Sequence, residues 1–194
     1  ARDLGLAYAA QKIVVEGLIA AGEGDIAGWK VGLTTRRMQE MCGVGQPIAG
    51  AILTGRVRRS AAELSAAAFV RLGLESEIAL RVARPLPDGA LAPAQVLACL
   101  DLACAAFEVV EDRAADYARL DAASIVADNS WNAGVVLGQP TPVADLEILT
   151  GRAGVLTVNG VVNDRGSSND VGGDPLLIVA WLARELAARG QALP

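Results

Sequence analysis

The chain has 194 residues, of which 53% are hydrophobic, 4% aromatic and 20% charged, with a formal net charge of −5. This length suits one domain, or one domain with a helical appendage, and the composition excludes a disordered tail. The arginines of this acidic chain are scattered, so no clustered basic face for a nucleic acid is expected. The apolar run 176–183 is far too short to cross a bilayer, so a membrane is not an expected partner either.

Histidine and cysteine usage narrows the chemistry. The 194 residues include no histidine, so they cannot by themselves form a Ser-His-Asp triad, a Cys-His pair or a zinc site that contains histidine. The three cysteines, Cys42, Cys99 and Cys104, have no CxxC spacing and are expected to be buried thiols in a reducing compartment. Because no secretion or lipidation motif is visible, the cytoplasm is the expected location.

The hydrophobic pattern of the first half predicts helices and strands in alternation. In chain order they are a helix over 6–21, a strand over 28–33, a helix over 35–41, a strand over 49–57 and an extended segment over 67–82. Gly22 and Gly24 are expected to end the first helix, and Gly73 to interrupt the extended segment.

The second half continues with a helix over 93–105, strands over 106–111, 134–137, 147–149 and 154–162, and a helix that begins at Pro175. Asn159-Gly160 is the sequence typical of a tight hairpin turn, and Asp174 is expected to cap the last helix. Residues 113–132 are expected to be mostly loop. Together the elements predict a mixed α+β fold rather than a regular alternation of strands and helices around a parallel sheet.

Lysine is rare in this chain, which has fifteen arginines but only Lys12 and Lys30. A lysine offers what arginine cannot, a compact ammonium able to lose its proton near neutral pH. Lys12 lies on the polar side of an amphipathic helix and is expected to be solvated. Lys30 lies in Gly28-Trp-Lys-Val-Gly-Leu-Thr34, between apolar neighbours, where burial is expected to lower its pKa. The alternative is a lysine at a strand edge with no chemical role.

Three glutamates are candidate metal ligands. In the alternating segment 74–80, Glu75 and Glu77 fall on one strand face, where they repel each other unless water, a cation or a metal compensates. Glu108 interrupts the apolar segment 105–110, where a carboxylate is costly to bury without a partner. The alternatives are a solvated outer face for the pair and an edge-strand position for Glu108. If the three meet, which the spacing leaves open, they form an oxygen site for Mg²⁺ or Mn²⁺.

The polar cluster Asp128-Asn129-Ser130-Trp131-Asn132 surrounds a large ring in a chain with few aromatic residues. One interpretation is a turn with a buried tryptophan, and the other is the lining of a pocket.

Five of these segments occur in an order that resembles one enzyme family. They are Gly28-Trp-Lys-Val-Gly-Leu-Thr34, the Glu75-x-Glu77 strand, Phe107-Glu108-Val-Val-Glu-Asp-Arg113, Val126-Ala-Asp-Asn129 and Ala180-Trp-Leu-Ala183. Over residues 4–193 the chain resembles the 2-keto-4-pentenoate hydratase/4-oxalocrotonate decarboxylase family, within the fumarylacetoacetate hydrolase superfamily. The resemblance implies a mixed β-roll or barrel, with an N-terminal helical part that we place at 1–45 and a mixed-sheet catalytic domain at 46–194.

The resemblance also implies the roles of individual residues. The metal ligands of the family match Glu75, Glu77 and Glu108, and its essential lysine matches Lys30. The residues expected to contribute to substrate binding are Leu33, Asn129 and Trp131.

The chain departs from the family pattern in three places. Ile48 replaces an acidic residue in the Pro-Asp-aromatic-Gly segment, which weakens the assignment to the hydratases. Trp131 replaces a serine, which indicates a reshaped pocket. The family's last strands and a Thr-Gly segment that helps to bind substrate would lie beyond Pro194, so we expect the sequence to be incomplete at its C-terminal end relative to the family.

These observations predict a metal-dependent lyase, a hydratase or a decarboxylase, that acts on a small unsaturated 2-keto acid such as 2-hydroxypenta-2,4-dienoate in aromatic meta-cleavage catabolism. The expected cofactor is Mg²⁺ or Mn²⁺. We expect a homo-oligomer, which could also associate with a related enzyme of the same pathway. Two alternatives stay open, a C–C bond hydrolase of acylpyruvate-like diketo acids and a non-catalytic partner subunit of the same fold.

Overall fold

The computed structural model describes residues 3–87, 89–145 and 149–193, and it divides the chain into two compact units. The first unit comprises 1–77 and 106–139, and the second comprises 78–105 and 140–193. Strands β4 (Leu72–Val82) and β5 (Leu100–Glu111) each begin in one unit and end in the other. The division at residue 45 that the sequence suggested stays a prediction.

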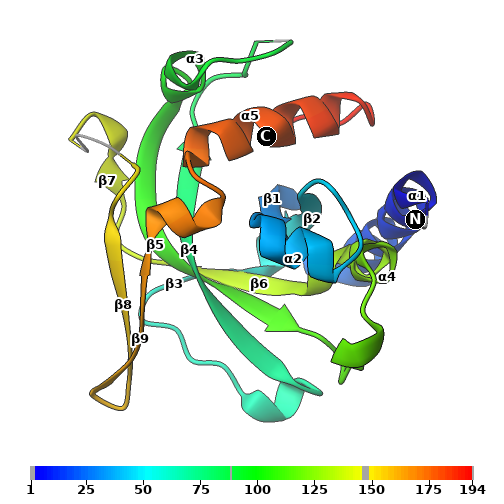
Figure 1. Cartoon of the computed structure of the whole chain (residues 1–194). Coiled ribbons are helices and arrows are strands. Elements are labelled where there is room, and N and C mark those ends of the chain that lie inside the picture. Colours follow the sequence, from blue (N-terminus) through cyan, green and yellow to red (C-terminus); the bar gives the residue numbers. More distant parts are fainter. Residues whose placement is uncertain (1–2, 88, 146–148, 194) are drawn as a thin grey trace. The chain divides into compact units, whose positions relative to one another are not determined.

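The first unit contains the elements that carry the candidate site (Figure 1). Besides the first part of β4 and the last part of β5, they are α1 (Leu4–Leu18), β1 (Ile26–Gly32), α2 (Arg36–Met41), β2 (Ile48–Leu53), β3 (Val57–Arg59), α4 (Ala122–Ala127) and β6 (Asn132–Leu137). β1 and β2 form an antiparallel pair, in which Lys30 lies opposite Gly50. A second sheet has the strand order β3-β6-β5-β4, with β6 antiparallel to β5 and parallel to β3.

Helix α1 packs against α4, and its buried face closes a small core with β2. The side chain of Gln11, on α1, donates to the carbonyl oxygens of Ala49 at 2.8 Å and Val126 at 2.9 Å. α1 continues into a π-helical turn, and the segment Leu4–Glu23 is long and apolar enough to cross a membrane by length and composition alone. Its buried polar contacts are those of a helix packed within a folded unit.

The second unit contains α3 (Pro93–Leu97), β7 (Thr141–Pro142), β8 (Ala153–Val158), β9 (Val161–Ser167) and α5 (Pro175–Ala187), with the remaining parts of β4 and β5. α3 packs against α5 over a core that includes Val96 and Leu176. β8 and β9 form a hairpin whose turn residues, Asn159 and Gly160, both have the positive φ angles expected of an Asn-Gly turn.

Several sequence predictions are confirmed, and others are wrong for identifiable reasons. Asp174 caps α5 by accepting from the amide of Leu176 at 2.9 Å, as expected. The helix predicted over 93–105 ends at Leu97, because the segment from Leu100 pairs as a strand within the sheet and sheet pairing outweighs the helix propensity of alanine.

Three further segments differ in detail from their predictions. The strand predicted over 49–57 is interrupted by a 3₁₀ turn at Thr54–Arg56, and the extended segment predicted from residue 67 begins at Leu72. The region 113–132, predicted to be mostly loop, contains α4. Residues 147 and 148 of the strand predicted over 147–149 lie outside the described residues.

Candidate active site

The three glutamates converge on one point in the first unit. Glu75 and Glu77 project from β4 and Glu108 from β5, its neighbour in the sheet. One carboxylate oxygen of each lies within 4.8 Å of the others. Glu108 is 3% exposed, whereas Glu75 is open to solvent, so the cluster extends from the interior of the unit to its surface. Sequence alone left this meeting open, and the structure supplies it.

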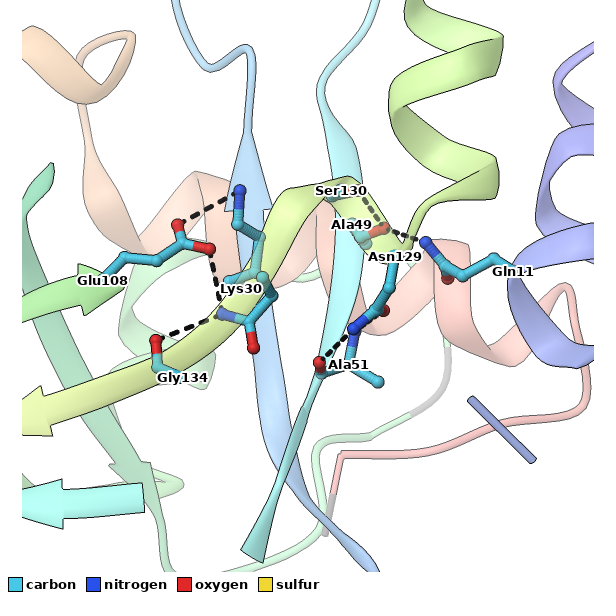
Figure 2. Close-up of polar contacts among 9 residues, drawn as sticks. Gln11, Lys30, Ala49, Ala51, Glu108, Asn129, Ser130 and Gly134 are labelled. Carbon is cyan, nitrogen blue, oxygen red and sulfur yellow. Dashed lines mark hydrogen bonds and ion pairs between the residues drawn. The ribbon is translucent and has the colours of Figure 1, made fainter. Parts of the chain in front are cut away.

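Lys30 is joined to the same cluster from the β1–β2 pair. Its Nζ lies 3.1 Å from Oε2 of Glu108, and the two side chains are only 12% and 4% exposed. Figure 2 shows the ammonium and the carboxylate pointing toward each other across the gap between β1 and β5. The structure thus brings together all four residues that the sequence predicted as the lysine and the metal ligands.

Asn132 also contacts Glu108, although it was predicted only as one member of the polar cluster 128–132. Its Nδ2 donates to Oε1 of Glu108 at 2.9 Å and to the carbonyl oxygen of Gly134 at 3.4 Å. Asn132 is 3% exposed. The available signal was a polar residue at the start of an apolar strand, in the segment that follows Asn129.

The crowding of carboxylates perturbs their protonation. Burial, and next the charge of Glu108, raise the pKa of Glu77 from 4.5 to about 7, although Lys30 opposes the change. Burial also raises the pKa of Glu108 above its ordinary value, against the opposing effects of Lys30 and the hydrogen bond from Asn132. Glu77 and Glu108 therefore keep their protons to a higher pH than isolated glutamates do.

The pKa of Lys30 differs from the sequence expectation. Burial alone lowers the pKa of this ammonium, as predicted, but the charges of Glu108 and the two glutamates on β4 outweigh burial. The pKa of Lys30 is therefore raised above 10.5, and the expectation of a lowered value is wrong for the protein without a cation. The shift depends on how close the three carboxylates lie to Lys30 in space, which the local sequence around Lys30 does not determine.

Asn129 holds the backbone of β2, the strand opposite Lys30. Its Oδ1 accepts from the amide of Ala51 and its Nδ2 donates to the carbonyl of the same residue, both at 2.8 Å (Figure 2). Asn129, Ser130 and Trp131 all have positive φ angles, a strained conformation for residues other than glycine. Since its side chain is engaged on both atoms, the contacts of Asn129 favour a positioning role, and its substrate-binding role stays a prediction.

Trp131 and Leu33 are the other residues expected to contact substrate. The Trp131 ring packs against Tyr117, with ring centroids 6.1 Å apart. The hydrogen bond from Tyr117 to Asp112 raises the pKa of the Tyr117 hydroxyl most, and the charge of Glu75 also raises it. Trp131 therefore packs against a tyrosine whose pKa the charge of Glu75 helps to raise. The carbonyl of Leu33, just after β1, accepts from the side chain of Gln39 at 2.9 Å, and its role in binding substrate stays a prediction.

The donor set fits a hard divalent cation. Three carboxylate oxygens lie close together, and at high pH no proton neutralises their charge. The exposed position of Glu75 leaves room for water ligands. A bound cation would offset the burial and the carboxylate repulsion that raise the pKa values of Glu77 and Glu108.

Comparison with known proteins identifies the family. No protein-family model matches the chain. The 2-keto-4-pentenoate hydratase of Paraburkholderia phymatum is 35% identical over 192 residues, which cover 98% of this chain and 72% of that protein. The chain belongs to the 2-keto-4-pentenoate hydratase/4-oxalocrotonate decarboxylase family. The family expected from the sequence, and with it the expectation of an enzyme, is confirmed.

Solved structures agree with this family and its fold. The 4-oxalocrotonate decarboxylase of Pseudomonas putida G7, solved with magnesium and adipate, is 27% identical and covers 99% of this chain and 72% of its own, with a TM-score of 0.90. A Yersinia pestis protein described as a fumarylacetoacetate hydrolase family protein is 16% identical, with a TM-score of 0.52 over 72% of this chain and 65% of its own, and shares the fold alone. The expected α+β fold of the fumarylacetoacetate hydrolase type is therefore confirmed.

Proposed function

We propose that this family member is a divalent-metal-dependent lyase that hydrates, or decarboxylates, a small unsaturated 2-keto acid such as 2-hydroxypenta-2,4-dienoate in aromatic meta-cleavage catabolism. The observation that carries the proposal is the buried contact between Lys30 and Glu108 within the group of three carboxylates. A lysine of this kind beside a cluster of carboxylates unites a proton donor with a cation site in one unit.

Glu75, Glu77 and Glu108 would hold the cation, for which Mg²⁺ and Mn²⁺ are the candidates because all the donors are oxygens. When bound, the cation supplies Lewis-acid polarisation to the carboxylate and 2-oxo oxygens of the substrate. The exposed Glu75 marks the side from which a small acid can reach the cluster.

Lys30 performs the proton transfer in this proposal. Its Nζ is fixed by Oε2 of Glu108 and shielded from bulk water, so it can hold a proton and deliver it to a carbon of the dienol during ketonisation. Neutralisation of the carboxylates that raise its pKa would ease release of that proton. The same proton transfer serves hydration and decarboxylation, since both pass through an enol of the 2-keto acid.

The hydrolase alternative receives less support. Attack of water on a diketo acid needs a base, and the 194 residues include no histidine to serve as one. The non-catalytic alternative is disfavoured because all four residues of the lysine and carboxylate group are present and in contact range.

The test is turnover of 2-hydroxypenta-2,4-dienoate and of its carboxylated relative, followed by loss of dienol absorbance with Mg²⁺ and with a chelator. Lys30→Arg is expected to lower turnover by at least ~10²-fold, because arginine stays protonated even when a bound cation neutralises the carboxylates, whereas a lysine can then release its proton. Lys12→Arg is the matched control, since Lys12 is an exposed residue of α1 paired with Glu16. Full activity of Lys30→Arg, or activity unaffected by chelator, would contradict the proposed mechanism.

We further propose that the protein is a cytoplasmic homo-oligomer. The β8–β9 hairpin exposes four valines, and a two-stranded hairpin with apolar side chains in water is marginally stable by itself. The exposed residues are Val155, Val158, Val161 and Val162. Light scattering coupled to size exclusion is expected to give a mass above that of one chain, and a monomer at micromolar concentration would contradict this expectation.

A further inference from the structure

The side chain of Asn132 supplies the second donor to the Glu108 carboxylate. Lys30 binds Oε2 at 3.1 Å, and Nδ2 of Asn132 binds Oε1 at 2.9 Å. The two oxygens of this buried carboxylate are therefore held by different elements, β1 on one side and β6 on the other. With both oxygens engaged, the carboxylate plane cannot rotate without breaking a contact.

The orientation of the Asn132 amide is fixed by its neighbours. Nδ2 faces two acceptors, Glu108 and the carbonyl of Gly134, so a flipped amide would place Oδ1 against two oxygens. Among the described residues, Oδ1 of Asn132 is buried without a hydrogen-bond partner. An orphaned buried acceptor costs free energy, which a leucine of similar size would not incur. Unlike leucine, the Asn132 amide donates a hydrogen bond to Glu108.

We propose that Asn132 is a positioning residue, which fixes the Glu108 carboxylate for the divalent cation through a neutral N–H donor. The inference rests on the proposed function only in that it takes the three glutamates as the cation site. A neutral donor suits this task, because it orients the carboxylate without adding a positive charge. The ammonium of Lys30, in contrast, adds a positive charge that repels the cation.

The local backbone explains how Asn132 is placed. It is the first residue of β6 and lies opposite Val110, where the pairing of β5 and β6 shifts register next to Glu108. The preceding turn is tied to β2, since Ser130 Oγ donates to the carbonyl of Ala49 at 2.8 Å. The position of Asn132 is thus set by the sheet on one side and by the anchored turn on the other.

The experiment measures Mn²⁺ affinity of the full chain without substrate, by electron paramagnetic resonance of the free ion. Asn132→Leu, which keeps the size but removes the donor, is expected to raise the Kd about tenfold or more. Asn132→Ala leaves space for a water that can donate to Glu108, so its Kd is expected to rise no more than that of the leucine variant. Asn163→Leu, on the exposed surface of β9, is the matched control and is expected to leave the Kd unchanged.

Each outcome separates the positioning role from a packing role. A leucine variant with a raised Kd and a metal-free unfolding midpoint within about 4 °C of the wild type supports the inference. A Kd of the leucine variant within about twofold of the wild type overturns the inference and leaves the proposed function intact. An alanine variant that binds Mn²⁺ clearly more weakly than the leucine variant also overturns the inference, because that order would indicate a packing role. Failure of the wild type to bind Mn²⁺ would overturn the proposed cation site and this inference together.

Discussion

Replacing Glu77 by glutamine is expected to remove a large part of the pH dependence of stability in the metal-free protein. The pKa of Glu77 is raised from 4.5 to about 7 by burial and by the charge of Glu108. Since the folded state holds this proton more tightly than the unfolded state, the stabilisation is fully present below pH 4.5 and is lost as the pH rises through about 7. The gap between the two pKa values corresponds to about 3 kcal/mol of unfolding free energy.

The assay is urea unfolding in chelator, followed by circular dichroism, at about pH 5 and about pH 8. The unfolding free energy of the wild type is expected to fall by up to ~3 kcal/mol more than that of Glu77→Gln between these conditions. Glu63→Gln, a change at an exposed residue, is the matched control and should show the wild-type fall. Excess Mg²⁺ is expected to restore the stability of the wild type at the higher pH and to help the Glu77 variant less, because a carboxylate ligand is missing. An identical fall in the wild type and Glu77→Gln would refute the reasoning.

Three further substitutions and one control test the residues around the site. Asn129→Ala leaves the amide and carbonyl of Ala51 buried without their Asn129 partners. It is expected to lower the free energy of unfolding by about 2–4 kcal/mol, measured by urea unfolding. A loss below about 0.5 kcal/mol would contradict this and mean that water replaces both contacts. Gly50→Ala places a Cβ 2.6 Å from the carbonyl oxygen of Asn129 and is expected to lower the free energy of unfolding by more than about 2 kcal/mol. Gly45→Ala is the control, because the space around Gly45 is open, and it is expected to leave the free energy of unfolding nearly unchanged. Trp131→Ala is expected to raise KM for the 2-keto acid while leaving Mn²⁺ affinity without substrate unchanged, and an unaltered KM would count against its role in substrate binding.

Local features of the chain were determined by the sequence alone. The Asn159-Gly160 turn and the Asp174 cap depend on a few adjacent residues, whose backbone preferences act before any packing occurs. The same holds for the placement of Glu75 and Glu77 on one face of β4, because strand geometry alternates with period two. The ordered motifs were also sufficient to indicate the family.

Tertiary structure decided what depends on residues far apart in the chain. The segment from Leu100 is a strand because it pairs within a sheet, a contact that its alanine-rich sequence does not encode locally. The contact of Lys30 with Glu108 and the donation by Asn132 require three strands to meet. The direction of the Lys30 pKa shift follows from the same meeting, because the field of several carboxylates depends on their distances in space, and only the folded chain sets those distances.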